Sequence, residues 1–318
     1  MTTIFITGST SFLGRSVISR LEKSKKYTLI KTSFSGDIKN GVQKLDLLDF
    51  KKTRALLVKT KPSVILHFAA LVNLTRDFET ARKCIDANII ATLNLLESTK
   101  DLGVKKIVFT STEEVYGDNK TPYKEHQNPR PPSMYSISKV AGENLLQYYS
   151  VLHGFTFIAL RFGTFFGPGS QPDRFLTQVI QTALANKQIL LNSGQLKRDY
   201  IFIDDAVLAI EQAIKTPISK NEIINIGGKT AISLYTFVKK VVKHSQNTSK
   251  IILNAFPDRV GEARYQKLSI SRAKKILKWE PTTSLDDGIK KSVDFFRQNN
   301  YHVNDENARP RSKTSRRN

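Results

Sequence analysis

The first half of the chain alternates between short apolar runs and longer amphipathic stretches. The apolar runs are rich in β-branched and aromatic residues, which is typical of buried strands. They cover residues 2–7, 27–30, 43–45, 63–68, 106–110 and 155–160. The stretches between them are mostly helix-like. Strands that alternate with helices in this way predict an α/β fold with a doubly wound parallel sheet.

One of the helix-like stretches, residues 78–100, carries apolar residues at intervals of three and four. This spacing predicts one long helix with a single apolar stripe that faces the sheet. The stripe consists of Phe78, Ala81, Ile85, Ile89, Leu93 and Leu96.

The first predicted strand passes directly into a glycine-bearing turn, and a helix through Leu21 follows. At such a helix N-terminus the backbone amides can hold a pyrophosphate, and glycine allows the ligand to approach closely. Gly8 and Gly14 fit these roles, whereas Ser11 stands where a third glycine is expected. An ordinary turn between strand and helix is the alternative interpretation.

Tyr135 and Lys139 are four residues apart, so both side chains leave the same face if the segment is helical. The lysine ammonium then stabilises a tyrosinate and brings the pKa of the tyrosine, ordinarily about 10, closer to the working range. A pair of solvated surface residues is the alternative. Gly8, residues 67–70 and residues 111–112 all follow predicted strand ends. We therefore expect one crevice outside the carboxyl ends of the strands.

In their order and residue types these segments resemble the extended short-chain dehydrogenases/reductases of the NAD(P)-dependent nucleotide-sugar epimerase/dehydratase type. The similarity runs from Met1 to about Phe296. Further matching segments are residues 46–49, 161–168, 198–205, 225–228, 259–262 and 273–281.

The resemblance implies a Rossmann fold in two parts and a homodimer formed through two helices of the sheet part. Residues 1–165 with 200–227 would form the dinucleotide-binding domain. Residues 166–199 with 228–300 would form a smaller, mostly helical cap that binds the nucleotide sugar.

Three residues receive catalytic roles from the resemblance. Thr112 would hydrogen-bond the sugar oxygen, and Tyr135 would take the proton of the C4 hydroxyl while hydride passes to a retained nicotinamide. Lys139 would bind the nicotinamide ribose and lower the pKa of Tyr135. The resulting 4-keto sugar would then be epimerised, dehydrated or decarboxylated. The alternatives are an NADPH-dependent reductase of a keto or 4-keto sugar, and a non-catalytic fold that binds RNA or senses redox state.

Glu113 and Glu114 bear on the fate of that 4-keto sugar. In the 4,6-dehydratases of the family, the matching segment carries an acid that expels the C6 hydroxyl and a glutamate that removes the C5 proton. Two adjacent carboxylates in one pocket would also raise the pKa of one of them. However, side chains that alternate after a strand usually face opposite ways, which favours Glu113 in solvent and only Glu114 facing the sugar.

The candidate cofactor-binding residues follow the predicted strand ends. They are Gly8, Ser11, Phe12, Leu13, Gly14, Thr32, Asp46, Leu47, Phe68, Ala69 and Ala70, together with Tyr135 and Lys139. Asp46 would contact the adenine amine, or alternatively cap the next helix. No carboxylate stands at the end of the second strand, and Lys31, Ser33 and Arg15 could attract a 2′-phosphate. This favours NADP, with NAD as the alternative.

The candidate substrate-binding residues are Thr112, Thr164, Arg198 and Arg259. Thr164 replaces an asparagine that touches the substrate in many relatives, and it offers one hydrogen bond in place of a paired donor and acceptor. The two arginines match positions that contact the diphosphate in the family, and a guanidinium suits phosphate oxygens. Solvated surface arginines are the alternative. No metal site is expected.

Composition places further bounds. A chain of 318 residues with 40% hydrophobic content can bury a substantial core. The single cysteine, Cys84, excludes an intramolecular disulfide and favours the cytoplasm. We expect neither a signal peptide nor a transmembrane segment, because no run approaches the ~18 apolar residues that a span requires.

The net charge is +22, with 50 basic and 28 acidic residues. Part of the excess lies in residues 301–318, which we expect to be a disordered basic tail. A basic surface attracts anionic nucleotide sugars, acidic membrane surfaces and nucleic acid alike. Because no RNA-binding motif is present, we expect weak contact with acidic surfaces and no specific nucleic-acid partner.

Overall fold

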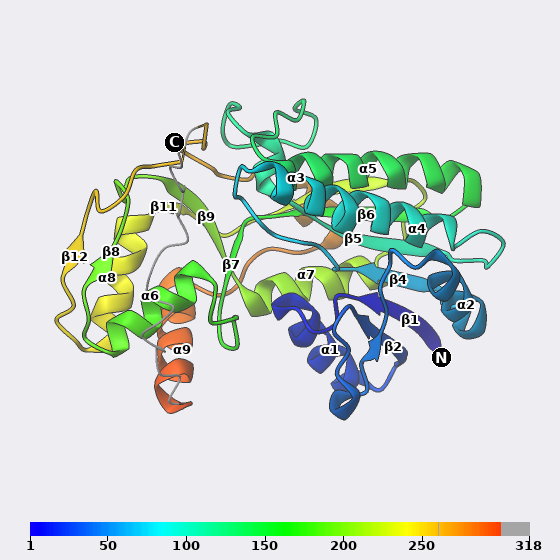
Figure 1. Cartoon of the computed structure of the whole chain (residues 1–318), viewed down its shortest axis with the longest axis horizontal. Coiled ribbons are helices and arrows are strands. Elements are labelled where there is room, and N and C mark those ends of the chain that lie inside the picture. Colours follow the sequence, from blue (N-terminus) through cyan, green and yellow to red (C-terminus); the bar gives the residue numbers. More distant parts are fainter. Residues whose placement is uncertain (260, 300–318) are drawn as a thin grey trace.

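The computed structural model describes residues 1–259 and 261–299. Its centre is a seven-stranded sheet with the order β10-β6-β5-β4-β1-β2-β3, and every pairing in it is parallel (Figure 1). The strands are β1 (Thr2–Thr7), β2 (Tyr27–Ser33), β3 (Gln43–Lys44), β4 (Val64–His67), β5 (Lys106–Thr112), β6 (Thr156–Phe162) and β10 (Glu222–Ile226). The predicted doubly wound sheet is therefore confirmed, and strand ends differ from the predictions by a few residues at most.

The strand order reverses between β1 and β4. From β1 the chain builds β2 and β3 on one side, and it then returns to add β4, β5 and β6 on the other side. In doubly wound sheets, ligands bind at the carboxyl edge of the strands, at the point where the order reverses.

Helices cover both faces of the sheet (Figure 1). α1 (Phe12–Ser24) and α7 (Ile203–Lys215) pack side by side on one face. α2 (Phe50–Thr60), α4 (Ala91–Glu97) and α5 (Met134–His153) cover the other. Leu57, Leu95 and Leu146 of these three helices are fully buried against apolar strand residues of the sheet, as expected for a parallel sheet that is covered on both sides.

The helix predicted over residues 78–100 forms and ends at Glu97, but its apolar stripe is right only in its last part, where Leu96 is buried and Leu93 packs on the core. It consists of α3 (Phe78–Cys84), the π-helical turn η2 (Ile85–Ile90) and α4. The π turn adds a residue, which rotates the buried face. Phe78 is 79% exposed and Ile85 is 38% exposed. The buried positions are instead Thr80, Cys84, Asn88, Ala91, Thr92, Leu95 and Leu96.

The buried Asn88 explains how a polar residue occupies this face. Its side-chain oxygen accepts from the backbone N–H of Leu71, and its amide donates to the Leu71 carbonyl and to Ser138 Oγ of α5. A buried amide with all these partners carries no desolvation penalty from unmade bonds.

The second region lies at the carboxyl edge of the sheet and combines small sheets with helices (Figure 1). β9 (Lys197–Phe202) pairs with β7 (Thr164–Phe166) and β11 (Ala231–Ser233), and β8 (Ile189–Leu190) pairs with β12 (Ile251–Ile252). The helical elements are α6 (Phe175–Leu184), α8 (Leu234–Ser245), η4 (Ala273–Leu277) and α9 (Leu285–Gln298). Residues 200–202 thus belong to the small sheet, whereas α7 and β10 belong to the large one.

One hydrophobic core joins the two regions. It runs from Val17 of α1 and Ile210 of α7 through Phe166 and Phe202 to Phe296 of α9 without interruption. The predicted tail, residues 301–318, lies outside the described residues. Within the described part of the chain, no helix has both the length and the apolar character needed to cross a membrane.

Candidate functional site

The turn after β1 has the geometry of a phosphate-binding loop. Gly8 has a φ of +67°, and a Cβ there would lie 2.6 Å from the backbone nitrogen of Ala69. Ser11 caps α1 by accepting from the Gly14 N–H. Among the described residues, no acceptor is bonded to the backbone N–H of Phe12 or Leu13. These two amides at a helix start suit an anion, so the loop fits a dinucleotide pyrophosphate.

Tyr135 and Lys139 lie on the first two turns of α5, as predicted. The Lys139 ammonium is buried, donates to the carbonyl of Thr110 at 2.7 Å and lies 5.9 Å from the centre of the Tyr135 ring. Thr112 lies at the end of β5 and hydrogen-bonds Tyr135. The three residues therefore converge at the carboxyl end of β5, next to β4.

The electrostatics of this group differ from the sequence-based expectation. Burial raises the pKa of Tyr135 above its ordinary value, and the nearby Glu114 raises it further, whereas Arg174 and the bond with Thr112 lower it. Burial also lowers the pKa of Lys139 to about 7. The expected lowering of the tyrosine pKa by Lys139 is thus absent in the polypeptide alone, because burial dominates and the opposing contributions come from Arg174 and Thr112.

Glu114 faces the predicted catalytic group. Its Oε1 accepts from Ser133 Oγ at 2.5 Å, and its charge acts on Tyr135. Burial raises the pKa of Glu114, the bond from Ser133 opposes this rise, and Glu262 adds to it. A raised pKa brings the carboxyl group closer to the working range of a general acid or base.

Glu113 corrects the prediction that it points to solvent. It is 4% exposed; its Oε1 accepts from Thr164 Oγ1 at 3.3 Å, and its Oε2 has no partner among the described residues. Burial raises the pKa of Glu113 well above its usual range, and the charge of Asp199 adds to the effect. Strand alternation fails here because β5 ends at Thr112 and the next residues form a 3₁₀ turn, η3 (Glu113–Tyr116).

The two predicted phosphate arginines have different surroundings. The Arg198 guanidinium donates to Glu262 Oε1 at 2.6 Å and to the carbonyls of Lys197 and Ala263. Arg259 is exposed, and its charge lowers the pKa of Glu114. Arg259 therefore lies on the Glu114 side of the site, whereas Arg198 acts on Glu113.

Several predicted cofactor residues make contacts within the protein. Thr32 is buried, and its hydroxyl donates to the carbonyl of Ile6. Asp46 accepts from the N–H of Leu48, while Asp49 is the cap of α2. The Leu47 and Phe68 side chains are buried. Ala69 and Ala70 are partly buried and follow β4 beside Gly8.

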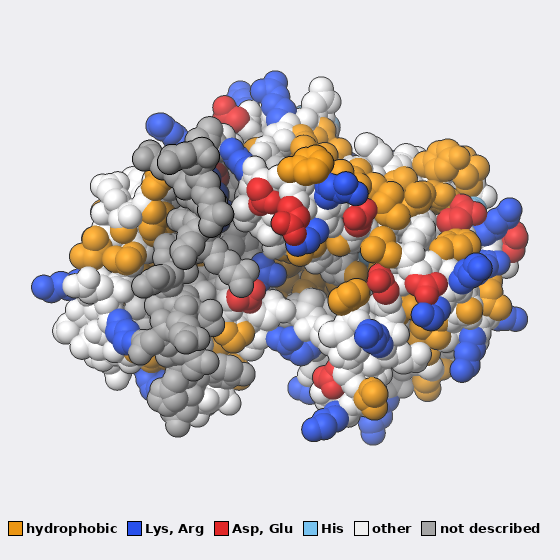
Figure 2. Space-filling model, in the orientation of Figure 1, with side chains coloured by type: hydrophobic (Ala, Val, Ile, Leu, Met, Phe, Trp, Pro, Cys, Tyr) orange, Lys and Arg blue, Asp and Glu red, His pale blue; other side chains and the backbone are white. Residues whose placement is uncertain are grey.

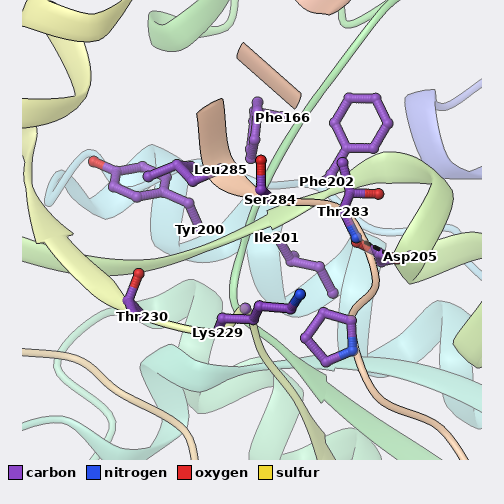
Figure 3. A pocket seen from close by; sticks show the side chains of 12 residues that line it. Phe166, Tyr200, Ile201, Phe202, Asp205, Lys229, Thr230, Thr283, Ser284 and Leu285 are labelled. Atoms are coloured by element: carbon purple, nitrogen blue, oxygen red, sulfur yellow. Dashed lines mark hydrogen bonds between the residues drawn. The ribbon is translucent and has the colours of Figure 1, made fainter. Parts of the chain in front are cut away.

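A small cavity of about 20 Å³ lies apart from this group, where β9 meets the start of α9 (Figure 3). Asp205 lines it and accepts from the N–H and hydroxyl of Thr282 and the N–H of Thr283. A cavity of this size can hold one water molecule, whereas ligand sites measure roughly 300–1,000 Å³. It is therefore not the substrate site.

Sequence reasoning missed three residues around the glutamates. Ser133 bonds Glu114 and also caps α5, with Ser136 at the reciprocal position. The available signal was the spacing of Ser133 and Ser136, which is that of a capping box at the start of a helix. Asp199 is fully buried and bonded to Lys267 Nζ at 2.9 Å, close enough to raise the pKa of Glu113. No sequence signal connects it to Glu113, because the two come together only in the fold.

His67, at the end of β4, is a buried histidine in its neutral form. Thr92 Oγ1 donates to the carbonyl of Asn88, so it accepts from Nε2–H of His67. Thr7 Oγ1 accepts from the N–H of Ala69 and donates to Nδ1. Burial, together with the charge of Lys139, lowers the pKa of His67 to about 3.

We expect His67 to make folding sensitive to acid. Between pH 6.5 and 3 the unfolded chain binds a proton that the folded protein does not, so stability is lost as the pH falls. The loss should be about 3 kcal/mol between pH 6.5 and 4. Urea unfolding at both pH values should show a smaller difference for His67→Gln than for the wild type. An equal change in the exposed His126→Gln control would contradict this assignment.

Comparisons with known proteins agree with the fold and identify the family. The sequence model described as "NAD dependent epimerase/dehydratase family" matches residues 4–227. A UDP-glucuronate 4-epimerase of Thermodesulfobacterium geofontis is 31% identical over 258 residues, covering 80% of this chain and 79% of that protein. A dTDP-D-glucose 4,6-dehydratase of Dictyostelium discoideum is 29% identical, covering 76% and 62%.

A solved structure gives the same picture. The UDP-glucuronic acid 4-epimerase of Bacillus cereus, in complex with UDP-glucuronic acid and NAD, is 26% identical to this chain. The match covers 93% of this chain and 99% of that one, with a TM-score of 0.85.

Proposed function

Because the chain belongs to the NAD-dependent epimerase/dehydratase family, we propose that it is an NAD(P)-dependent enzyme that oxidises a nucleotide sugar at C4 and then epimerises or dehydrates it. The observation that carries the proposal is the convergence of Thr112, Tyr135 and Glu114 at the carboxyl end of β5. The relatives described above act on UDP- and dTDP-sugars, which supports a nucleotide sugar as the substrate.

The residues of the chain have distinct tasks in this reaction. Tyr135 accepts the proton of the C4 hydroxyl, while Thr112 holds the same oxygen in place by a hydrogen bond. Lys139, fixed by the Thr110 carbonyl, keeps a cationic donor beside the phenol. The turn from Gly8 to Gly14 fits the cofactor pyrophosphate. A bound oxidised nicotinamide would supply the hydride acceptor and a positive charge.

The buried glutamates support a second candidate for the step that follows oxidation at C4, namely elimination of water from the 4-keto sugar. A ketone at C4 makes the C5 proton acidic, and removal of that proton needs a base in the same pocket. Glu114 meets this need because it is close enough to Tyr135 for its charge to act on the phenol. Glu113 is a buried carboxyl group with a raised pKa, which suits an acid that protonates a leaving hydroxyl.

A product screen tests the function. The protein is incubated with UDP-, dTDP- and GDP-sugars, and products are identified by mass and by stereochemistry. Unchanged mass with a new stereoisomer identifies an epimerase, loss of water a dehydratase, and loss of carbon dioxide a decarboxylase. A reductase instead consumes NADPH in each turnover. No conversion of any sugar by a folded protein that binds the cofactor would contradict the proposal.

We expect Glu114→Gln to lower dehydration by about 10²–10⁴-fold and to retain epimerisation, because only elimination requires a base for the C5 proton. The measurement is the rate of each product in the same screen. Glu79→Gln, at an exposed glutamate of α3, is the matched control and should change neither rate. Dehydration at the wild-type rate in Glu114→Gln would exclude Glu114 as that base.

The structure weakens the argument for NADP over NAD. Lys31 Nζ pairs with Glu22 at 3.0 Å and donates to the Asn40 carbonyl. Arg15 donates to the carbonyls of Thr10 and Gly169. Since both cations are engaged, we propose that NAD binds at least as well as NADP. Parallel titrations with the two cofactors measure this.

We also infer a homodimer through α5. Its outer face carries an exposed apolar stripe, Ile137, Tyr148, Val151 and Leu152, and the adjacent α3 exposes Phe78. Such a stripe suits burial against a second copy. Sedimentation of the purified protein gives its oligomeric state.

A further inference from the structure

The strands of the large sheet begin at the edge opposite the predicted catalytic group. This edge carries a row of lysines. Five segments lead into β2, β4, β5, β6 and β10, namely residues 25–26, 61–63, 98–105, 154–155 and 216–221. They contain six lysines, no arginine and a single acidic residue, Asp101. We call these the edge lysines: Lys25, Lys26, Lys61, Lys100, Lys105 and Lys220.

The edge lysines are neighbours in space because the strands they precede are neighbours. Strands in a sheet lie about 4.8 Å apart, so the starts of β10 to β2 span about 24 Å. The register agrees: the N–H of Lys105 donates to the Ser63 carbonyl, and that of Ser63 donates to the Thr3 carbonyl. Figure 2 shows Lys and Arg side chains gathered at this end of the molecule, over α2 and the start of β1.

These charges are available for a partner. All six side chains are exposed, and none forms an ion pair within the described part of the chain. Lys106 shows the contrast, since its ammonium is used internally to bond the carbonyls of Ala213, Ile214 and Thr216 at the end of α7. A lysine at a helix C-terminus can compensate the helix dipole. Lys105 directly precedes β5 and Lys220 lies two residues before β10, and neither follows a helix end closely.

One end of the row borders an open hollow of about 410 Å³ between α5 and the start of β10. Its lining includes the side chains of Lys220, Ser219 and Gln147, whereas the lining residues Asn221 and Ser150 hydrogen-bond each other. Ammonium, hydroxyl and amide donors together suit the phosphate and glycerol oxygens of a lipid headgroup.

We propose that this edge docks on membranes that contain anionic phospholipids. Lysine carries a point charge on a flexible side chain, which suits the diffuse negative charge of a lipid surface. Each lysine near such a surface strengthens binding by on the order of fivefold. The segments contain no arginine, and their one aromatic residue, Phe155, is buried, so they lack the arginine forks and stacking aromatic side chains by which proteins bind nucleic acid. The predicted catalytic group lies at the other edge of the sheet, so docking leaves the substrate and cofactor site accessible.

Vesicle co-sedimentation of the full chain tests the proposal. We expect binding to phosphatidylcholine vesicles that contain phosphatidylglycerol, weakening with salt, and no binding to phosphatidylcholine alone. A variant with Lys25→Glu, Lys61→Glu, Lys105→Glu and Lys220→Glu should bind at least about 100-fold more weakly. The control, Lys120→Glu, Lys124→Glu, Lys243→Glu and Lys250→Glu, makes the same charge change at exposed lysines elsewhere and should lose no more than about threefold.

Circular dichroism is the check that both variants fold. Both variants keep the wild-type sequence over residues 300–318. If the edge variant does not fold, the double variant Lys105→Gln with Lys220→Gln replaces it, with an expected loss of about 25-fold. Equal losses in edge and control variants would overturn the proposal. So would binding of random RNA, but not of vesicles, with the same dependence on the edge lysines.

Discussion

Tyr135→Phe is expected to lower kcat by about 10²–10⁴-fold while cofactor affinity stays nearly unchanged. The substitution removes one hydroxyl, the group that we assign to proton transfer, and keeps the ring in place on α5. Lys139 remains bonded to the Thr110 carbonyl, and the turn from Gly8 to Gly14 is untouched. The loss should therefore appear in turnover and not in binding.

The measurement combines steady-state kinetics, on whichever nucleotide sugar the product screen identifies, with a cofactor titration. Tyr148→Phe, at an exposed tyrosine of the same helix, is the matched control and should retain wild-type turnover. Unchanged turnover in Tyr135→Phe would refute the mechanism. A loss of folding or of cofactor binding would instead assign Tyr135 a structural role.

Arg161→Met should lower the free energy of unfolding by roughly 3–5 kcal/mol. Arg161 of β6 and Glu143 of α5 form a two-pronged ion pair, with Nε to Oε1 at 2.9 Å and Nη2 to Oε2 at 2.6 Å. Their side chains are 3% and 4% exposed. Ser111 Oγ adds a further bond to Glu143. Without the arginine, the buried carboxylate loses both of its charged hydrogen bonds and keeps only the attraction of the Lys139 ammonium.

The double variant Arg161→Met with Glu143→Leu tests whether the loss of stability arises because one charge of the pair is left behind in the interior. Because two apolar side chains leave neither member of the pair behind without the other, it should be more stable than Arg161→Met alone. Urea unfolding of the wild type and both variants at one pH provides the comparison. A single variant within about 1 kcal/mol of the wild type would contradict this account.

The sheet was predictable from sequence because its strands are short, apolar and bounded by clear turns. Thr2–Thr7 was predicted with the bounds that the structure has, and the glycine turn followed from it. Where the prediction failed, a local pattern met a change of backbone geometry. The stripe from Phe78 to Leu96 assumed a uniform helix, and one π turn rotated it. Glu113 was assigned to solvent by strand alternation, but the strand had already ended.

Long-range electrostatics were the other part that the sequence could not supply. The spacing of Tyr135 and Lys139 was predicted correctly, yet the direction of the tyrosine pKa shift depends on burial and on Glu114, which only the fold reveals. The engagement of Lys31 by Glu22 and Asn40 likewise involves segments nine residues away on either side. A sequence motif identifies the titratable groups of a site, whereas the fold determines the pKa of each group.

The uninterrupted core from α1 and α7 to α9 has a consequence for how the molecule comes apart. A fragment that stopped at residue 227 would keep the large sheet but strip the covering from Phe166 and Phe202, both almost fully buried in the intact chain. Phe237, Val293 and Phe296, their partners in that core, would be missing. The Rossmann half is therefore not an autonomous module, and melting should proceed in one cooperative transition that includes both halves.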